Sequence, residues 1–369
     1  MMRGFSLAVW AALSVLGCGG GDEAKGGSAG ADGGADGPAA SSPYTIEAFD
    51  AVRITSDSSA PNFQHATADI ELRDAPFASV KLVVDLGTTC YPFDGWKDNP
   101  PPPGQDWPAD CDAFDRNFEL SLDDPEADGA APGLELVRAI TPFGGPEHLE
   151  VDVTDVANGS PGKHRLKVTI PTWADGAGKV SGSSGGWNVT ARLEVTPGPA
   201  PRRVLAVTPL FYGDQSGPDA NERSAKLVVP EGTRRARVEY RVTGHGGGTG
   251  AGCIGPAEEF CARVHTVFLD EQQIGLLDPW RTDCDALCTL AHQDNGGAGF
   301  DYCKENPCGA IESVRAPRAN WCPGSMTPPF ILEGGPMTEP GEHELRWRVS
   351  EIAEGGMWRV SATFFAFGD

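Results

Sequence analysis

The feature that most constrains this chain of 369 residues is a repetition of short apolar runs separated by Gly, Pro and Asp. Apolar and polar residues alternate in many of these runs, as in Val238, Tyr240 and Val242, and alternation with a period of two is typical of half-buried β-strands. The 48 glycines and 31 prolines exceed what a helical protein needs. No stretch combines helical length with an amphipathic pattern. We therefore predict an all-β protein.

The strands fall into two groups on either side of a proline-rich segment that begins at Thr196. We expect strands at residues 66–72, 79–86, 149–156, 165–170, 187–195, 226–229, 237–243, 264–270, 343–349 and 358–367. Strands of this texture favour two antiparallel jelly-roll β-sandwich domains packed side by side. The expected N-terminal domain covers residues 44–197 and the linker 198–203. The C-terminal domain covers residues 204–369, with a Cys-rich insertion at 275–329.

The N-terminal segment has the pattern of an export signal. A short positive start at residues 1–3 precedes an apolar stretch at 5–16, which is too short to span a membrane. The run Val15-Leu16-Gly17-Cys18 resembles a bacterial lipobox, so we expect a signal peptide at 1–17 and a lipidated Cys18. An ordinary signal peptide with an incidental cysteine is the alternative. Residues 18–43 are expected to form a flexible Gly/Ala/Ser/Asp tether. The expected location is therefore an exported lipoprotein at the outer membrane or cell surface.

The charge of the chain excludes several partners. With 52 acidic and 29 basic residues the formal net charge is −23, which argues against nucleic acid and against docking on an anionic membrane surface. Membrane contact is expected only through the N-terminal lipid. We expect a monomer without a cofactor.

Cysteine usage agrees with export. With Cys18 assigned to the lipid, nine of the ten cysteines remain, so at least one is unpaired or pairs between chains. The expected disulfide cysteines, with no pairing assigned, are Cys90, Cys111, Cys253, Cys261, Cys284 and Cys322. The alternative for Cys284, Cys288, Cys303 and Cys308 is a four-thiolate zinc site, which export makes the less favoured of the two.

The most distinctive chemical segment is CDAFDR at residues 111–116. If it is strand-like, Asp115 and Ala113 lie on one face and Asp112, Phe114 and Arg116 on the other. A carboxylate beside a guanidinium is usually a surface salt bridge. The remainder of the sequence favours a functional role for Asp115.

Four blocks carry a resemblance to a known family. They are Cys90 with CDAFDR (111–116); RAITPF (138–143) with LEVDVTD (149–155); AEEFCARVHT (257–266); and RANWCPG (318–324). Together and in this order they resemble the bacterial peptide-N-glycosidase F family, amidases that release N-linked glycans by cleaving the asparagine side-chain amide. The resemblance covers the chain from about Tyr44 onward and implies two jelly rolls with the active site between them.

The resemblance also implies roles for individual residues. Asp115 matches the principal catalytic aspartate and Glu259 a second catalytic acid, with Glu258 as the competitor because the register is uncertain by one residue. The residues that match substrate-contacting positions are Arg116, Trp173, Arg318 and Trp321. Structural alternatives remain open: both tryptophans as core aromatics, Glu259 as a solvated acid, Arg318 as an ion-pair partner, and His265 as a structural histidine.

Three departures from the family pattern affect the functional interpretation. Pro171 stands where the family has another glutamate, Gly244-His245-Gly246 lacks a family tryptophan, and the loop between Cys90 and Cys111 is long and proline-rich. The leading hypothesis is an amidase acting on N-glycosylated proteins or glycopeptides. The alternative is a non-catalytic glycan- or protein-binding lipoprotein. A copper monooxygenase, related by fold, is disfavoured because the seven histidines include no His-x-His or adjacent pair.

Overall fold

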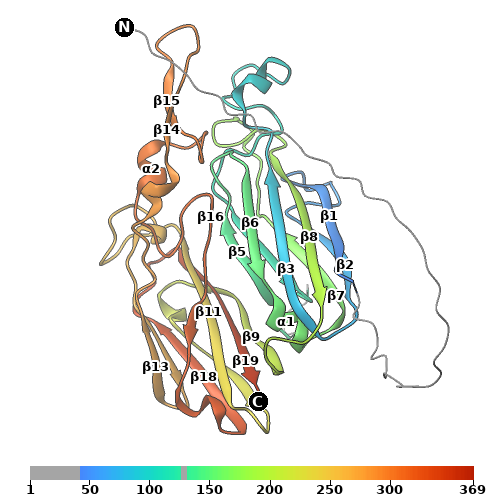
Figure 1. Cartoon of the computed structure of the whole chain (residues 1–369). Coiled ribbons are helices and arrows are strands. Elements are labelled where there is room, and N and C mark those ends of the chain that lie inside the picture. The colour runs from blue at the N-terminus through green and yellow to red at the C-terminus, as the bar shows by residue number, and fades with distance from the viewer. Residues whose placement is uncertain (1–41, 126–130) are drawn as a thin grey trace, which may run out of the picture. The chain divides into compact units, whose positions relative to one another are not determined.

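The computed structural model describes residues 42–125 and 131–369, in which antiparallel strands predominate (Figure 1). The predicted signal peptide, Cys18 and most of the tether lie outside the described residues. Within the described part of the chain, no helix is long and apolar enough to span a membrane.

Strands from the first half build two antiparallel sheets around one core. One sheet has the order β1 (Tyr44–Thr55), β8 (Gly186–Pro197), β3 (Phe77–Gly87) and β6 (Glu147–Asp152). The other has the order β16 (Ser325–Met326), β5 (Leu134–Ile140), β4 (Asn117–Leu122), β7 (Gly162–Thr169) and β2 (His65–Leu72). Leu82 and Val84 of β3 pack in the same core as Phe118 and Leu120 of β4. Full burial of one such side chain contributes about 1.5–3 kcal/mol.

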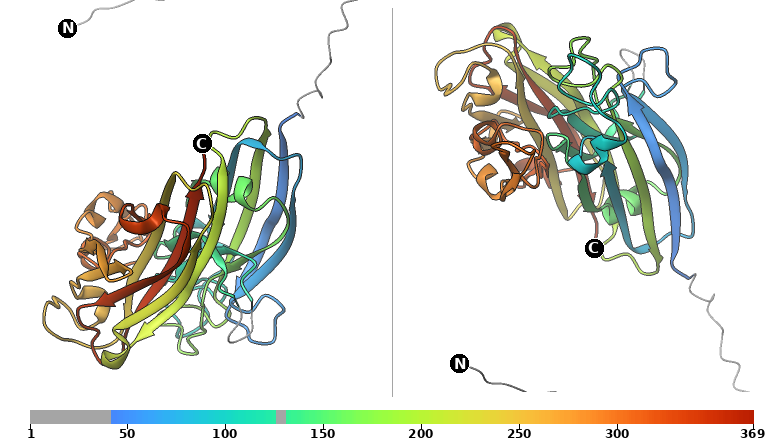
Figure 2. Two further views of the ribbon diagram at one scale, coloured as in Figure 1. Left: turned by 90° about the horizontal axis from the view of Figure 1, so that it is seen from below. Right: turned by 90° about the horizontal axis from the view of Figure 1, so that it is seen from above.

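Strands from the second half build two more antiparallel sheets. One has the order β17 (Phe330–Leu332), β11 (Arg235–Gly246), β19 (Gly356–Phe367) and β9 (Val204–Ser216). The other has the order β10 (Glu222–Val229), β18 (Gly341–Val349), β12 (His265–Leu269) and β13 (Gln272–Leu277). The predicted alternation is confirmed, because Val238, Tyr240 and Val242 are all buried in the core between them. The two halves lie side by side (Figure 2).

The all-β, two-jelly-roll architecture is thus confirmed, but one expected strand is wrong. We expected a strand at residues 149–156, whereas β6 ends at Asp152 and the short helix α1 (Thr154–Gly159) follows. The Asp152 carboxylate accepts a hydrogen bond from the Thr154 backbone N–H at 2.9 Å. This contact turns the chain away from the sheet edge at the start of the helix.

Short elements occupy the remaining loops. The hairpin β14 (Leu290–Gln293) and β15 (Phe300–Cys303) and the helix α2 (Ile311–Arg315) belong to the predicted Cys-rich insertion. The 3₁₀ turns are η1 (Phe93–Lys97), η2 (Pro218–Ala220), η3 (Glu258–Phe260), η4 (Cys284–Leu287) and η5 (Gly335–Thr338). From the same insertion, β16 pairs with β5 of the first half. Each of the other named sheets of the described chain takes its strands from one side of residues 198–203.

The described cysteines form four disulfides, in agreement with the predicted use of cysteine. The pairs are Cys90–Cys111, Cys253–Cys261, Cys284–Cys322 and Cys288–Cys303. Cys308 is free, and burial raises the pKa of its thiol to about 12. The zinc alternative is wrong, because three of its four cysteines are bonded to sulfur. Two of the bridges hold the long insertion in place.

Candidate active site

Asp115 lies in a loop immediately before β4. The expected strand at 111–116 is wrong in detail: Cys111 forms an isolated bridge and residues 112–116 are irregular. Thr141 fixes this loop, since its hydroxyl donates to the Phe114 carbonyl at 2.9 Å and accepts from the Arg116 N–H at 2.8 Å. The Cys90–Cys111 disulfide anchors the other end of the loop. The loop is therefore held at both ends of the stretch that carries Asp115.

Glu259 lies on η3, in the other half of the molecule. The turn is closed by the neighbouring Cys253–Cys261 disulfide, and the Glu259 carbonyl accepts a hydrogen bond from the Ala319 N–H at 2.7 Å. The Glu259 side chain is 25 % exposed. This hydrogen bond places the loop that carries Arg318 next to the turn that carries Glu259, so that both side chains reach the site.

Arg318 connects the two predicted acids. Its Nη1 donates to Glu259 Oε1 at 2.8 Å, and its Nη2 lies 3.9 Å from Asp115 Oδ2. The same Nη2 donates to the Ser313 carbonyl at 2.7 Å, which fixes the guanidinium in place. The guanidinium is fully buried, with Phe260 and Trp321 rings 4.8 and 4.5 Å from its carbon. A single cation thus holds a carboxylate from each half of the chain.

The environment raises the pKa of both acids. The Asp115 side chain is 9 % exposed. Burial, with the nearby Glu259 charge, raises its pKa to about 7, against the opposing effect of Arg318. Burial also raises the pKa of Glu259, and Arg318 again opposes the shift. A carboxyl group that titrates near neutral pH can both take up and release a proton under physiological conditions.

Arg116 is held beside this pair by a separate ion pair. Its Nε and Nη2 donate to the two carboxylate oxygens of Asp112 at 3.0 Å each, and both side chains are buried. The Arg116 guanidinium carbon lies 4.7 Å from the Phe114 ring centre and 4.5 Å from that of Trp173. Trp173 is 45 % exposed. Of the predicted contact residues, Trp173 therefore offers an aromatic surface to solvent next to the acids.

Trp321 has a different environment from Trp173. It is 2 % exposed, its Nε1 donates to the Gly244 carbonyl at 2.9 Å, and it stacks on His245. Burial lowers the pKa of His245 to about 3, so the imidazole is neutral. The Trp321 ring packs against the Arg318 guanidinium. Its predicted contact with substrate stays a prediction.

Glu258, the competitor for the catalytic position, is a structural residue. Its buried carboxylate accepts hydrogen bonds from Arg263 Nε at 2.8 Å and from the Trp358 indole N–H at 2.9 Å. Every nearby contact of this side chain lies inside the second half. The geometry therefore assigns the position facing Asp115 to Glu259.

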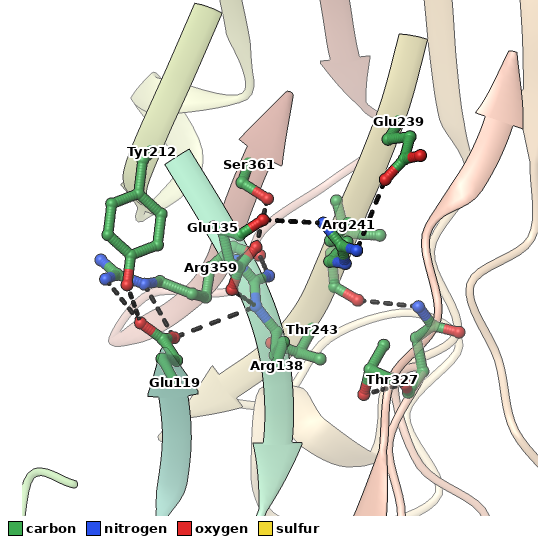
Figure 3. A network of polar contacts seen from close by, with 12 residues as sticks. Glu119, Glu135, Arg138, Tyr212, Glu239, Arg241, Thr243, Thr327, Arg359 and Ser361 are labelled. Carbon is green, nitrogen blue, oxygen red and sulfur yellow. Dashed lines mark hydrogen bonds and ion pairs between the residues drawn. The ribbon is translucent and has the colours of Figure 1, made fainter. Parts of the chain in front are cut away.

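A buried polar network between the halves was not predicted (Figure 3). Arg359 of β19 donates to both carboxylate oxygens of Glu119 on β4, at 3.1 and 2.9 Å, and Tyr212 donates to the same carboxylate. Burial acts to raise the pKa of Glu119, but the charges of Arg359 and Arg138 outweigh it and lower that pKa to about 2. The network fixes β4, the strand that follows Asp115, against the second half.

A second part of the network involves Glu135 of β5. Arg138 Nε donates to Glu135 Oε1 at 2.7 Å, and Ser361 of β19 donates to the other oxygen. Arg138 also donates to the Arg359 carbonyl at 2.6 Å. One feature of the sequence indicates this arrangement, which is that Glu135 and Arg138 are the charged residues in an otherwise apolar strand. A charge inside a doubly buried strand has to be paired.

Metal ligands are not grouped in the described residues. No set of three or more His, Cys, Asp or Glu side chains in residues 42–125 and 131–369 is arranged to hold a metal ion. The candidate site itself consists of two carboxyl groups, two arginines and aromatic side chains.

The fold and the site define a two-domain antiparallel β-sandwich protein in which an arginine joins two carboxyl groups from different halves. Residues 215–365 match the family model described as peptide-N-glycosidase F, C terminal. The second half of the chain is therefore similar to the peptide-N-glycosidase F family, in agreement with the predicted resemblance.

Individual proteins are similar to the chain as well. The chain is 26 % identical over 238 residues to peptide-N(4)-(N-acetyl-beta-D-glucosaminyl)asparagine amidase F of Elizabethkingia miricola, an alignment that covers 60 % of this chain and 58 % of that protein. The fold is similar to a crystal structure of peptide-N(4)-(N-acetyl-beta-D-glucosaminyl) asparagine amidase, with a TM-score of 0.62, 18 % identity, and coverage of 88 % of this chain and 96 % of that one. PNGF-II is similar with a TM-score of 0.64 and 17 % identity, over 88 % of this chain and 65 % of that one. The curated relative is thus matched over little more than half its length.

Proposed function

We propose that this protein is an amidase that hydrolyses the glycosyl-asparagine amide of N-linked glycoproteins or glycopeptides. The observation that carries the proposal is the placement of Asp115 and Glu259 around Arg318, with the pKa of Asp115 raised to about 7. The matched relative is named as an amidase acting on the same type of bond.

In the proposed reaction, ionised Asp115 accepts a proton from a water molecule as the water oxygen attacks the side-chain carbonyl carbon. Glu259, hydrogen-bonded to Arg318, orients that water. The C–N bond then breaks, and the proton passes from Asp115 to the departing nitrogen. The products are an aspartate side chain in the protein and a glycosylamine. Water supplies all the added atoms, so the step needs no co-reactant.

The remaining residues would position the substrate. Trp173 presents an exposed ring on which a sugar can pack, and Arg116 fixes that ring from behind. Approach from the solvent would pass Trp173 and the partly exposed Glu259, because Arg318 and Arg116 are themselves covered. The two acids therefore lie at the inner end of the path and the aromatic ring at the outer end.

The direct test incubates the fragment from Tyr44 onward with a denatured N-glycosylated protein. The described residues form one compact unit, so this fragment contains the whole site. Mass spectrometry is expected to show asparagine converted to aspartate at the glycan-bearing position, with the conversion lost in Asp115→Asn. The matched control is Glu342→Gln, an exposed acid at the start of β18, which is expected to retain full conversion. Conversion that survives in Asp115→Asn would remove Asp115 from the mechanism.

One observation favours a second candidate function, which is glycan binding without cleavage. Pro171 occupies an exposed position where the family resemblance expects a glutamate, and proline cannot ionise. A protein of this kind would retain a glycoprotein on a column of the immobilised fragment without converting its asparagine. Absence of conversion together with retention would establish this second function.

We also propose export as a lipoprotein through Cys18. The four disulfides among the described residues support an oxidising compartment. Metabolic labelling with a radioactive fatty acid is expected to mark the native protein and to be lost in Cys18→Ser. Labelling that persists in Cys18→Ser would contradict the proposal.

A further inference from the structure

A group of aromatic side chains from two distant segments meets at the rim of the molecule. Phe93 of η1 lies with its ring centre 5.4 Å from that of Phe300 and 5.3 Å from that of Tyr302, both on β15. Within the first segment, Trp96 lies 5.5 Å from Phe93 and 6.0 Å from Trp107. Figure 1 shows the hairpin and the loop of η1 at the same end of the molecule. The contact joins the long, proline-rich loop between Cys90 and Cys111 to the Cys-rich insertion.

These rings surround a hollow of about 290 Å³, which we call the rim hollow. Besides the aromatic rings it is lined by Asp106, Asp301, Pro307, Cys308 and Gly309. Its volume is near the lower limit for small-molecule sites in proteins. The hollow is therefore large enough for a single ring-sized group.

The walls of the rim hollow are held in place independently of any ligand. The Trp96 indole N–H donates to the Cys90 carbonyl at 2.9 Å, and that of Trp107 donates to the Lys179 carbonyl at 3.2 Å. The Cys90–Cys111 and Cys288–Cys303 disulfides anchor the two segments. Because backbone carbonyls already accept hydrogen bonds from both indole N–H groups, the tryptophans have only their apolar ring faces and edges left to contact a ligand. Phe300 is 42 % exposed.

The charges at the rim hollow select the class of ligand. Asp106 is paired with Lys179 at 3.0 Å, and Asp301 with His292 at 2.8 Å. Both carboxylates thus already have hydrogen-bonded partners. Carboxylate oxygens still accept hydrogen bonds from hydroxyl groups, and they repel anions. Apolar ring faces with acceptors at the edge suit a neutral sugar ring, which has apolar C–H faces and a hydroxyl periphery.

A series of packed side chains leads from the candidate active site toward the rim hollow. Phe143 lies with its ring centre 6.4 Å from that of Phe114, the neighbour of Asp115. On its other side Phe143 packs against Gly309, where a Cβ atom would lie only 2.3 Å from the Phe143 ring. Gly309 in turn lines the rim hollow. The rim hollow thus lies on the Phe143 side of Asp115, and a glycan with its first sugar beside Asp115 and Trp173 would reach it by extending toward that side.

We propose that the rim hollow is a second carbohydrate subsite that binds a neutral sugar from the outer part of the glycan. This inference rests on the proposed function in one respect, which is the position of the first sugar of the glycan beside Asp115. Sugar binding to the hollow itself is measurable without any cleavage.

The experiment uses Phe300→Ala and, as a second variant, Asp301→Ala, with Leu290→Ala as the matched control. Leu290 is an exposed apolar residue of the same hairpin and does not line the hollow. Calorimetric titration with a free, galactose-terminated N-glycan is expected to show binding weakened about three- to tenfold in Phe300→Ala. The control is expected to match the wild type. Thermal melting confirms that each variant is folded.

Kinetics with two glycopeptides test the connection with the active site. One carries the full neutral glycan and the other only its two innermost N-acetylglucosamines. Phe300→Ala is expected to raise KM for the first by the same three- to tenfold factor and to leave KM for the second unchanged. If the wild type cleaves neither peptide, the proposed function fails, while the titration still decides whether the hollow binds sugar.

Three results would overturn the inference. The first is equal glycan affinity in Phe300→Ala, Asp301→Ala and the control. The second is equally tight binding of a sialylated glycan, because the two carboxylates should disfavour it. The third is displacement of the neutral glycan by millimolar choline, which would show that the aromatic group binds cations instead.

Discussion

Glu258 and Glu259 are adjacent in sequence, but their carboxylates serve different arginines. Glu258 bonds Arg263 within the second half, at 2.8 Å, and is completely buried. Glu259 bonds Arg318 at 2.8 Å and faces Asp115 from the first half. The 3₁₀ geometry of η3 separates the two side chains in this way. One acid stabilises the loop that presents the other.

Replacement of the two glutamates should therefore have opposite effects. Glu258→Gln removes the buried carboxylate that pairs with Arg263, leaving this buried guanidinium with only the half-exposed Glu351 at 3.5 Å, and is expected to lower the free energy of unfolding by about 3–5 kcal/mol. Glu259→Gln is expected to abolish amidase activity with a much smaller loss of stability. Urea denaturation and the glycopeptide assay on both variants measure this. Loss of activity in a fully stable Glu258→Gln would show that the register is shifted by one residue.

The activity should depend on pH through Asp115. Because the pKa of Asp115 is about 7 and the ionised form accepts the proton, kcat/KM is expected to fall about tenfold per pH unit below pH 7 and to level off above it. Initial rates on one glycopeptide between pH 5 and 9 would measure the profile. A profile that is flat through pH 7 would contradict the role of Asp115 as the base.

Asp115 should also make the fold less stable as pH rises. Its pKa is higher in the folded protein, about 7, than the ordinary value of 3.8. The stability gained from its proton is complete below about pH 4 and is lost as pH rises through 7. The free energy of unfolding of Asp115→Asn, minus that of the wild type, is expected to increase from pH 4.5 to pH 8. Denaturation at several pH values checks this, and a constant difference would show that Asp115 titrates normally.

Arg318 should be required for both acids to coexist. Arg318→Met removes the buried cation that lies between Asp115 and Glu259, and the pKa of each is expected to rise further. At pH 8 we expect a loss of about 3–5 kcal/mol in the free energy of unfolding, and a smaller loss at pH 5, where Asp115 is protonated. Arg165→Met, which breaks an exposed pair with Asp69, is the control and should change stability little at either pH. Equal losses at both pH values would contradict the electrostatic role.

The two tryptophans should separate binding from stability. Trp173→Ala removes an exposed ring and is expected to weaken glycan binding while the melting temperature changes little. Trp321→Ala creates a cavity beneath Arg318 and is expected to cost about 3–5 kcal/mol of stability. Titration with free glycan and thermal unfolding give the two readouts. A stable Trp321→Ala with weakened binding would instead support direct contact of Trp321 with substrate.

The strand framework could be predicted because its physical cause is local. A strand buried on one face requires an apolar residue at every second position, as in Val238, Tyr240 and Val242, and the sequence shows this directly. The prediction failed after Asp152, where one side-chain contact to the Thr154 N–H starts a helix inside an apolar run. Alternation of apolar and polar residues along the sequence does not indicate a side-chain contact of this kind.

The site was only partly predictable for a different reason. Asp115, Glu259 and Arg318 were identified by resemblance to a family, since nothing local in the sequence shows that three loops meet. The pairing of Glu119 with Arg359 depends on how the two halves pack, and it has no sequence pattern of its own. The rim hollow likewise joins Phe93 to Phe300 across most of the chain. Proximity created by tertiary packing leaves little trace in a single sequence.

The pairing of β16 with β5 has a consequence for the order in which the protein is made. Ser325 and Met326 complete one edge of a sheet whose other strands all lie before residue 170. During synthesis the unpaired backbone of β5 therefore stays exposed until most of the chain has left the ribosome. An open strand edge is a site of unwanted pairing between chains. The nascent first half thus depends on the late insertion for protection as well as for its final structure.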